Sequence, residues 1–233
     1  TTLAGALAGL PVSALREFGA TADLIRRMAV KGLVTIHHER HERDPFEGST
    51  SMGVTRDEGR VLTGEQEAAG LTLRTLLDEG LFRVALLHGV TGSGKTEIYL
   101  RLAEYVRASG RQTLLLVPEI ALTPSVSALF RSTFLSRVAI QHSGLSDGER
   151  HDQWQRIRGG EIDVVVGTRS AVFAPLPDPG LIIVDEEHDG SYKQEESPRY
   201  HGRDVAIVRG QAARALVLLG SATPSMETYQ NAV

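Results

Sequence analysis

The sequence predicts an α/β protein with a doubly wound, mostly parallel sheet, preceded by a small helical unit. Two observations carry this prediction. Short, continuously apolar runs alternate with segments of helical length, and a glycine-rich octapeptide, GVTGSGKT, lies between an apolar run and a helix-forming segment. Strands that are apolar without alternation are typical of parallel sheets covered by helices on both faces.

The elements follow in order along the chain. We expect strands at Val84–Leu87, Thr113–Val117, Val138–Gln141, Val164–Val166, Leu181–Val184 and Leu216–Leu219. Helices are expected at Glu97–Ala108, Asp147–Arg158 and Arg203–Ala213. Right-handed crossovers between such strands place ligand sites at their carboxyl ends.

Composition narrows the class of protein. The chain has 233 residues, a net charge of −4 and no cysteine, which excludes disulfides and a cysteine-ligated zinc site within it. No apolar run approaches the roughly 20 residues that span a bilayer, and no signal peptide is recognisable, so we expect no membrane contact. We divide the chain into a helical unit (residues 1–46), a polar linker (47–61) and a large α/β domain (62–233).

The first unit has the outline of a winged helix. We predict two helices, Val12–Phe18 and Ala22–Lys31, followed by a short strand, Leu33–Ile36. Thr21 is the predicted N-cap of the second helix, and Gly32 follows the end of that helix. The second helix carries three cations opposite its apolar side: Arg26, Arg27 and Lys31. They are candidate DNA contacts. The alternative is an ordinary solvated helix face, and the histidines of the following loop, His37, His38 and His41, are interpreted as surface rather than metal ligands.

The octapeptide has the pattern and the context of a phosphate-binding loop. Its glycines let backbone N–H groups turn around an anion at the start of a helix, whose partial positive charge adds to the attraction. Lys95 is placed to reach the β- and γ-phosphates, and Thr96 to ligate Mg²⁺. The candidate nucleotide-binding residues of the loop are Gly89, Thr91, Gly92, Ser93, Gly94, Lys95 and Thr96.

Acidic residues follow a later strand. Asp185 and Glu186 open the tetrapeptide DEEH directly after Leu181–Val184, which places them at the carboxyl edge of the sheet. Asp185 would hold the water shell of Mg²⁺, and Glu186 would orient and deprotonate the attacking water. With Lys95 they are the candidate catalytic residues, because phosphoryl transfer depends chiefly on positioning and charge neutralisation.

These motifs together resemble a known family. GVTGSGKT, DEEH and GSAT (220–223) follow the order of motifs I, II and III in superfamily 2 helicases. Further segments resemble the bacterial primosomal replication-restart helicases in particular: LVPEIALTP (116–124), HSGLSDGER (142–150) with Trp154, GTRSAVFAPL (167–176) and DEEHDGSYKQEESPRYHGRDVA (185–206). The resemblance covers about Leu62 to Tyr229 and implies a RecA-like first motor lobe.

The resemblance implies roles at matching positions. Gln66 in LTGEQ resembles the glutamine that reads adenine, the alternative being a surface glutamine. Thr168 and Arg169 resemble residues that grip the single-strand backbone, although Arg169 could form an internal ion pair instead. Ser221 and Thr223 resemble the motif that links nucleotide state to DNA, or they cap a turn before Pro224.

The segment Asp189–Arg203 resembles the aromatic-rich loop through which this family couples single-stranded DNA to hydrolysis. It interleaves aromatic and cationic side chains, of which Tyr192, Lys193, Arg199 and Tyr200 are the candidate DNA contacts. Aromatic rings stack on unpaired bases while cations neutralise phosphates. The alternative is that the two tyrosines pack on the domain surface.

For the whole protein, the resemblance implies an ATP- and Mg²⁺-dependent DNA helicase of the bacterial cytoplasm, associated with the nucleoid. It implies 3′ to 5′ movement on single-stranded DNA, action at forks, and contacts with single-stranded-DNA-binding protein and primosome proteins. The family's zinc segment, its 3′-end-recognition domain and its second lobe with an arginine finger have no match here. We therefore expect this chain alone to bind ATP weakly and, without the second lobe, to turn it over slowly or not at all.

Two other interpretations stay open. The chain could be a DNA-binding scaffold in which any nucleotide is structural, although a scaffold does not need the water-activating carboxylate of Glu186. It could also belong to another superfamily 2 translocase, of the fork-reversal or restriction type, although the Asp189–Arg203 loop argues against this.

Overall fold

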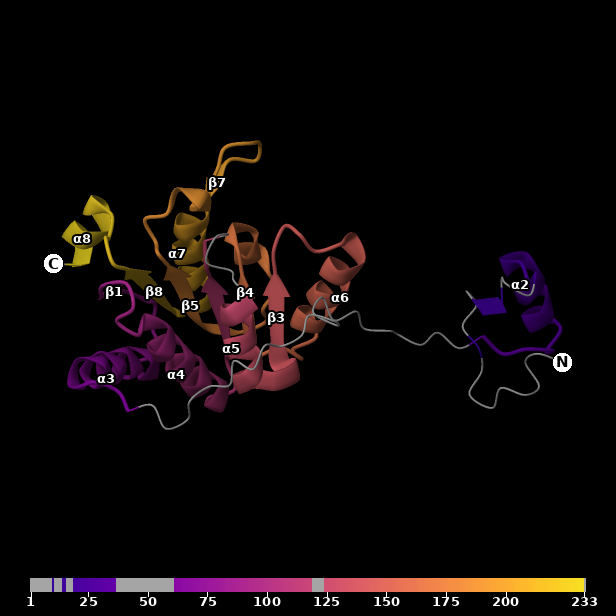
Figure 1. Cartoon of the computed structure of the whole chain (residues 1–233), viewed down its shortest axis with the longest axis horizontal. Coiled ribbons are helices and arrows are strands. Elements are labelled where there is room, and N and C mark those ends of the chain that lie inside the picture. The colour runs from indigo at the N-terminus through magenta and orange to yellow at the C-terminus, as the bar shows by residue number, and fades with distance from the viewer. Residues whose placement is uncertain (1–9, 11–13, 16–18, 37–60, 119–123, 233) are drawn as a thin grey trace. The chain divides into compact units, whose positions relative to one another are not determined.

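A computed structural model describes residue 10 and residues 14–15, 19–36, 61–118 and 124–232. The chain divides into two compact units, Thr1–Glu42 and Arg43–Val233 (Figure 1). No helix in the described part of the chain is both long and apolar enough to cross a membrane.

In the first unit the structure describes one complete helix, α2 (Ala22–Val30). Thr21 caps it as expected, because its hydroxyl accepts a hydrogen bond from the Leu24 amide at 3.3 Å. Gly32 follows with φ +69°, a conformation that favours glycine.

The predicted strand at residues 33–36 is wrong, since this segment pairs with no described residue and a strand needs a ladder partner. Most of the first predicted helix and the histidine-containing loop lie outside the described residues, so the winged helix stays a prediction.

The second unit is built on a six-stranded parallel sheet in the order β1-β8-β5-β2-β4-β3. Its strands are β1 (Arg83–His88), β2 (Gln112–Leu116), β3 (Val138–Gln141), β4 (Val164–Gly167), β5 (Pro179–Asp185) and β8 (Leu216–Ser221). All six predicted strands are confirmed, within a few residues at their ends. A separate antiparallel pair is formed by β6 (Lys193–Gln194) and β7 (Tyr200–His201).

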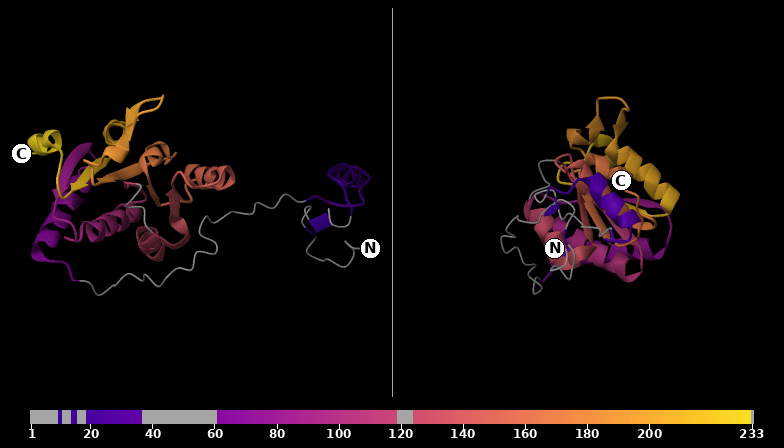
Figure 2. Two further views of the ribbon diagram at one scale, coloured as in Figure 1. Left: turned by 45° about the horizontal axis from the view of Figure 1, so that its top comes forward. Right: turned by 90° about the vertical axis from the view of Figure 1, so that its right-hand side faces the viewer.

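Helices cover both faces of the sheet (Figures 1 and 2). One face packs against α3 (Gly64–Asp78), α4 (Lys95–Ala108) and α5 (Pro124–Phe134). The other packs against α6 (Asp147–Arg158) and α7 (Gly202–Ala213). Short 3₁₀ helices, η2 (Leu135–Arg137), η3 (Arg169–Phe173) and η4 (Gly190–Tyr192), and a last helix, α8 (Met226–Ala232), complete the unit.

The strands alternate between two cores. On β2, Leu114 and Leu116 face the α6 and α7 side, whereas Leu115 faces the α3 to α5 side, and all three are at most 1% exposed. The sequence is therefore apolar at every position of such a strand, because side chains on both faces are buried.

We expect Gly210 to be a tight packing point between α7 and β8. A Cβ on Gly210 would lie 2.2 Å from Val217 Cγ2, so Gly210→Ala should lower the free energy of unfolding by about 1–3 kcal/mol. Gly70, also inside a helix, has no atom within 4 Å of such a Cβ, so Gly70→Ala should raise stability by up to about 1 kcal/mol. Urea unfolding followed by circular dichroism measures both, and equal effects would contradict the packing argument.

Candidate functional site

The phosphate-loop sequence forms a tight turn between β1 and α4. Gly92 and Gly94 have φ of +79° and +85°, which only glycine adopts without strain. A Cβ at Gly89 would lie 2.8 Å from Ser93 Oγ. The turn therefore needs glycine for its shape, and it places the main chain of the loop at the start of α4, as an anion-binding loop requires.

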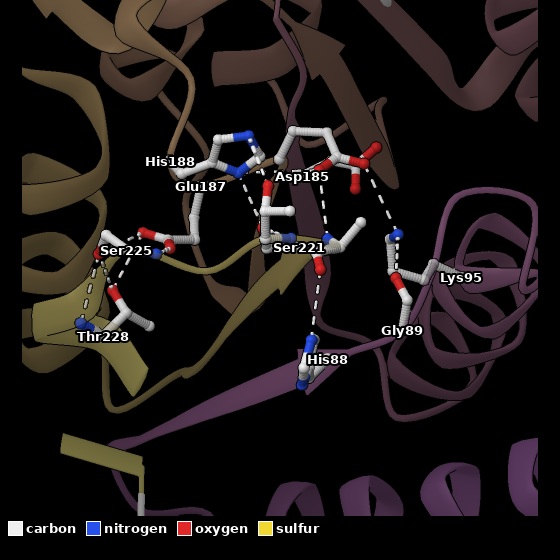
Figure 3. Close-up of polar contacts among 12 residues, drawn as sticks. His88, Gly89, Lys95, Asp185, Glu187, His188, Ser221, Ser225 and Thr228 are labelled. Carbon is white, nitrogen blue, oxygen red and sulfur yellow. Dashed lines mark hydrogen bonds and ion pairs between the residues drawn. The ribbon is translucent and has the colours of Figure 1, made fainter. Parts of the chain in front are cut away.

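Lys95 is folded back over this loop. Its Nζ donates to the Gly89 carbonyl at 2.8 Å and lies 3.6 Å from Glu186 Oε1, with the residue 8% exposed (Figure 3). The loop lysine and a motif II carboxylate, predicted to meet at one edge of the sheet, are thus brought together.

The two acidic residues leave β5 in different ways. Asp185 ends the strand opposite Gly220 of β8. Glu186 has φ +46°, a left-handed conformation that is uncommon for a residue with a side chain and that turns the chain sharply. Burial raises the pKa of Asp185, while the Tyr99 hydroxyl, which donates to Oδ1 at 2.8 Å, opposes this rise. A divalent cation would favour the ionised form of such a carboxyl group.

Gln66 contacts the loop from the start of α3. Its Oε1 accepts from the Thr63 amide at 3.0 Å and its Nε2 donates to the Ser93 carbonyl at 2.7 Å. The glutamine is therefore not a free surface side chain: it closes a capping box and fastens α3 to the phosphate loop. Gly94 leaves space for this contact, because a Cβ there would lie 2.5 Å from Gln66 Nε2.

The GSAT segment joins the DEEH segment through a histidine. His188 Nδ1 lies 2.8 Å from Ser221 Oγ, and its Nε2 lies 3.2 Å from Thr223 Oγ1 (Figure 3). Ser221 Oγ also accepts from the Thr223 amide at 3.0 Å, which is the turn cap that the sequence left as the alternative. Both hydroxyls thus serve the turn and the contact between the two motifs. The loop joins the same network, since the Gly89 amide donates to the Ser221 carbonyl at 3.1 Å.

Glu187, the third residue of DEEH, was missed by the sequence reasoning. It is fully buried and pairs with Arg203 at 2.9 Å. Its carboxylate also accepts from the Ser225 amide at 2.7 Å and from the Thr228 hydroxyl at 3.0 Å (Figure 3). Burial alone would raise the pKa of Glu187, but these donors hold it below its usual value. Glu187 thereby ties β5 to α7 and to the first turn of α8.

Arg169, at the start of η3, supports the loop that follows DEEH. Its Nη1 donates to the carbonyls of Ser191 at 2.9 Å and Lys193 at 2.7 Å, and its guanidinium lies over the Tyr200 ring at 5.9 Å. Tyr200 also packs edge-on against Phe173, with ring centroids 5.1 Å apart. Within the described part of the chain Arg169 pairs with no carboxylate, so the internal ion pair considered as an alternative does not form and its positive charge is not neutralised.

Two predicted DNA contacts need correction. Tyr192 is fully buried, and its hydroxyl donates to the Asp185 carbonyl at 2.7 Å, so its ring cannot stack on a base. Thr168 is 4% exposed: its amide donates to the Gln141 carbonyl and its own carbonyl accepts from Ala171. Tyr192 was assigned to DNA from the aromatic and cationic pattern of its segment, and Thr168 from the family resemblance, whereas both residues are buried.

Five of the other predicted DNA contacts lie at the surface. Lys193, at the start of β6, and Arg199, in the segment joining β6 and β7, are exposed on the hairpin that projects from the carboxyl edge of the sheet (Figure 1). On α2 of the first unit, Arg26, Arg27 and Lys31 are exposed, and Arg27 forms a 2.9 Å surface pair with Asp23. Such exposed pairs contribute little stability, so these cations stay available to a partner.

The fold and this constellation define a phosphate-loop α/β lobe in which the loop, DEEH and GSAT meet at one sheet edge. The sequence model of the DEAD/DEAH box helicase family matches residues 70–232, and the chain belongs to that family. Its relatives include the replication restart protein PriA of Bacillus subtilis, 49% identical over 89% of this chain, and that of Synechocystis, 44% identical over 92%. The chain spans about a quarter of the length of these relatives, 26% and 25% respectively.

A solved structure has the same fold at lower identity. RecG bound to a three-way DNA junction matches with a TM-score of 0.58 and 24% identity, over 74% of this chain and 22% of that chain. The RecA-like class of the second unit is therefore confirmed, and so is the resemblance to replication-restart helicases drawn from the motifs.

Proposed function

We propose that this chain is the nucleotide-binding lobe of an ATP-driven DNA helicase that acts in replication restart. The observation that carries the proposal is the meeting of Lys95 with the motif II acids: its Nζ lies 3.6 Å from Glu186 Oε1, and Asp185 precedes it at the same edge. A lysine on a glycine-rich loop, opposed by two carboxylates, matches the charge pattern of a magnesium nucleotide.

The position of each residue in the site indicates its role in binding and hydrolysing the nucleotide. The loop amides and Lys95 would hold the phosphates, exchanging the present Gly89 and Glu186 partners of the lysine for phosphate oxygens. Thr96 and Asp185 would hold Mg²⁺, whose chemistry is to neutralise charge on the β- and γ-phosphates. Once Lys95 turns to phosphate, Glu186 is released to accept a proton from water. Gln66, whose amide retains one N–H and one acceptor lone pair, is suited to read the adenine edge.

DNA would lie over the β6–β7 hairpin. Tyr200 is half-buried against Phe173, which leaves part of its ring to stack on a base. Lys193 and Arg199 are exposed on the same hairpin. Arg169 holds the start of the hairpin by donating hydrogen bonds to the Ser191 and Lys193 carbonyls. Arg26, Arg27 and Lys31 would add phosphate contacts from the first unit.

For the whole protein we infer, from its resemblance to replication restart proteins, 3′ to 5′ movement on single-stranded DNA at forks. Single-stranded-DNA-binding protein and primosome proteins are the partners expected on the same ground. The competing proposal is a scaffold that binds nucleotide without hydrolysis, and it is favoured by no specific contact described above.

Nucleotide binding should depend on Lys95. We expect Lys95→Ala to weaken binding of a fluorescent ATP analogue to this chain at least about tenfold, because a buried charge-assisted contact with phosphate is lost. Lys193→Ala, at an exposed lysine outside the loop, is the matched control and should leave binding nearly unchanged. Equal binding by both variants, measured by fluorescence titration in the absence of DNA, would contradict the site assignment.

Hydrolysis should depend on Glu186. In the full-length protein, Glu186→Gln keeps shape and burial but removes the proton acceptor, so turnover should fall by about 10²–10⁴ while ATP binding persists. Phosphate release and restart activity are measured together. Survival of restart activity without hydrolysis would establish the scaffold instead.

Coupling to DNA should depend on the Tyr200 ring. We expect Tyr200→Ala in the full-length protein to weaken single-stranded DNA binding by about tenfold, as the loss of one stacked base implies, and to reduce DNA-stimulated ATPase accordingly. Tyr200→Phe retains the ring and should stay near wild type. Parallel loss of ATP binding in Tyr200→Ala would show a folding defect rather than a coupling role.

A further inference from the structure

We propose that Tyr99 is a positioning residue for Asp185: its hydroxyl fixes the carboxylate in the orientation in which it receives magnesium. The proposal rests on the proposed function, since it assigns Asp185 to the magnesium site. Sequence reasoning gave Tyr99 no role, because a tyrosine at the fifth position of a buried helix resembles an ordinary core residue.

The contact comes from the helix that carries the loop lysine. Tyr99 lies one turn after Lys95 on α4, and its hydroxyl donates to Asp185 Oδ1 at 2.8 Å. Tyr99 is 1% exposed, so bulk water does not compete for the contact. A hydrogen bond to an ionised carboxylate in such surroundings is stronger and more directional than one in solvent. A helix that responds to phosphate through Lys95 therefore also holds the magnesium carboxylate.

The neighbouring strand leaves room for this hydroxyl. A Cβ at Gly220 would lie 1.8 Å from Tyr99 Oη and 3.3 Å from Asp185 Oδ1. Gly220 pairs with Asp185 on one side and with Leu87 on the other. The glycine of GSAT is thus required by the Tyr99–Asp185 contact, and no unusual backbone angle at Gly220 accounts for it.

Asp185 is held a second time through its main chain. The Tyr192 hydroxyl donates to the Asp185 carbonyl at 2.7 Å, and this tyrosine is also fully buried. With the main chain fixed by Tyr192 and Oδ1 fixed by Tyr99, little rotation of the carboxylate remains. Magnesium demands near-ideal octahedral geometry, so a ligand ordered beforehand binds it with a smaller loss of entropy.

The test distinguishes an effect on magnesium binding from an effect on nucleotide binding. A fluorescent, non-hydrolysable ATP analogue is titrated into this chain in EDTA and at rising Mg²⁺ concentration. We expect Tyr99→Phe to bind the analogue like wild type in EDTA, and to need about three- to tenfold more Mg²⁺ for the half-maximal gain in affinity. Tyr105→Phe is the matched control: it removes a hydroxyl from the same helix that bonds Asp78 Oδ1 at the surface, and its Mg²⁺ dependence should equal that of wild type.

A second variant keeps the test decisive if Tyr99→Phe folds poorly. Gly220→Ala retains the tyrosine but displaces its hydroxyl, so it should shift the Mg²⁺ requirement in the same direction. In the double variant the shifts should not add, because the hydroxyl that the new methyl group would displace is already gone. An unchanged Mg²⁺ requirement in both single variants, or equal loss of binding in EDTA, would overturn the proposal. Absence of magnesium-dependent binding in wild type would instead refute the proposed function.

Discussion

The site depends on the insertion of β8 between β1 and β5. This last strand of the sequence pairs in parallel with both, and its register sets Gly220 beside Leu87 and Asp185. The loop that follows β1 and the acids that follow β5 are therefore separated by one strand, at a spacing of about 5 Å on each side. Because parallel strands end at the same edge, three segments far apart in the sequence meet with their polar residues on one rim. The core beneath them is apolar on both faces, so that the rim is where charge can be placed.

The position of Lys95 shows how that charge is balanced. A lysine that is 8% exposed needs partners, and the structure provides the Gly89 carbonyl and Glu186. A phosphate group would replace both partners. Nucleotide binding would therefore exchange one set of contacts of Lys95 for another, and would not add contacts to an unpaired ammonium group. In the proposed mechanism, this exchange would release Glu186 from Lys95 when the nucleotide binds. The left-handed backbone of Glu186, which costs roughly 1 kcal/mol or more, is retained because it turns this carboxylate toward the loop.

The features that could be predicted from the sequence are those fixed by neighbouring residues, and the features that were missed depend on residues distant in the sequence. The six strands and the helices α4, α6 and α7 were found because apolar runs, glycines and helix lengths are local signals, and the loop with Lys95, Asp185 and Glu186 was found because its chemistry fixes its spacing. Tyr192 and Thr168 were misassigned because burial depends on the whole fold, which neither the polar segment around Tyr192 nor the family resemblance at Thr168 reveals. Glu187 and Tyr99 were missed because their partners, Ser225 and Asp185 among them, are distant in the sequence. The strand predicted at 33–36 failed since a strand needs a partner that local alternation does not supply.

The acidic segment is where three tasks of the proposed motor would meet: DNA contact, magnesium binding and the placement of α8. Tyr192 ties the start of the β6–β7 hairpin to the Asp185 carbonyl, and Arg203, just after that hairpin, is paired with Glu187. Glu187 in turn holds the first turn of α8 through Ser225 and Thr228. A base stacked on the hairpin would thus act on both ends of one short segment, Asp185–Glu187, which also carries the proposed magnesium ligand Asp185. Because removing one partner of a buried pair costs several kcal/mol, the proposed motor would keep these contacts when the hairpin moves, and the carboxylates and α8 would then move with it.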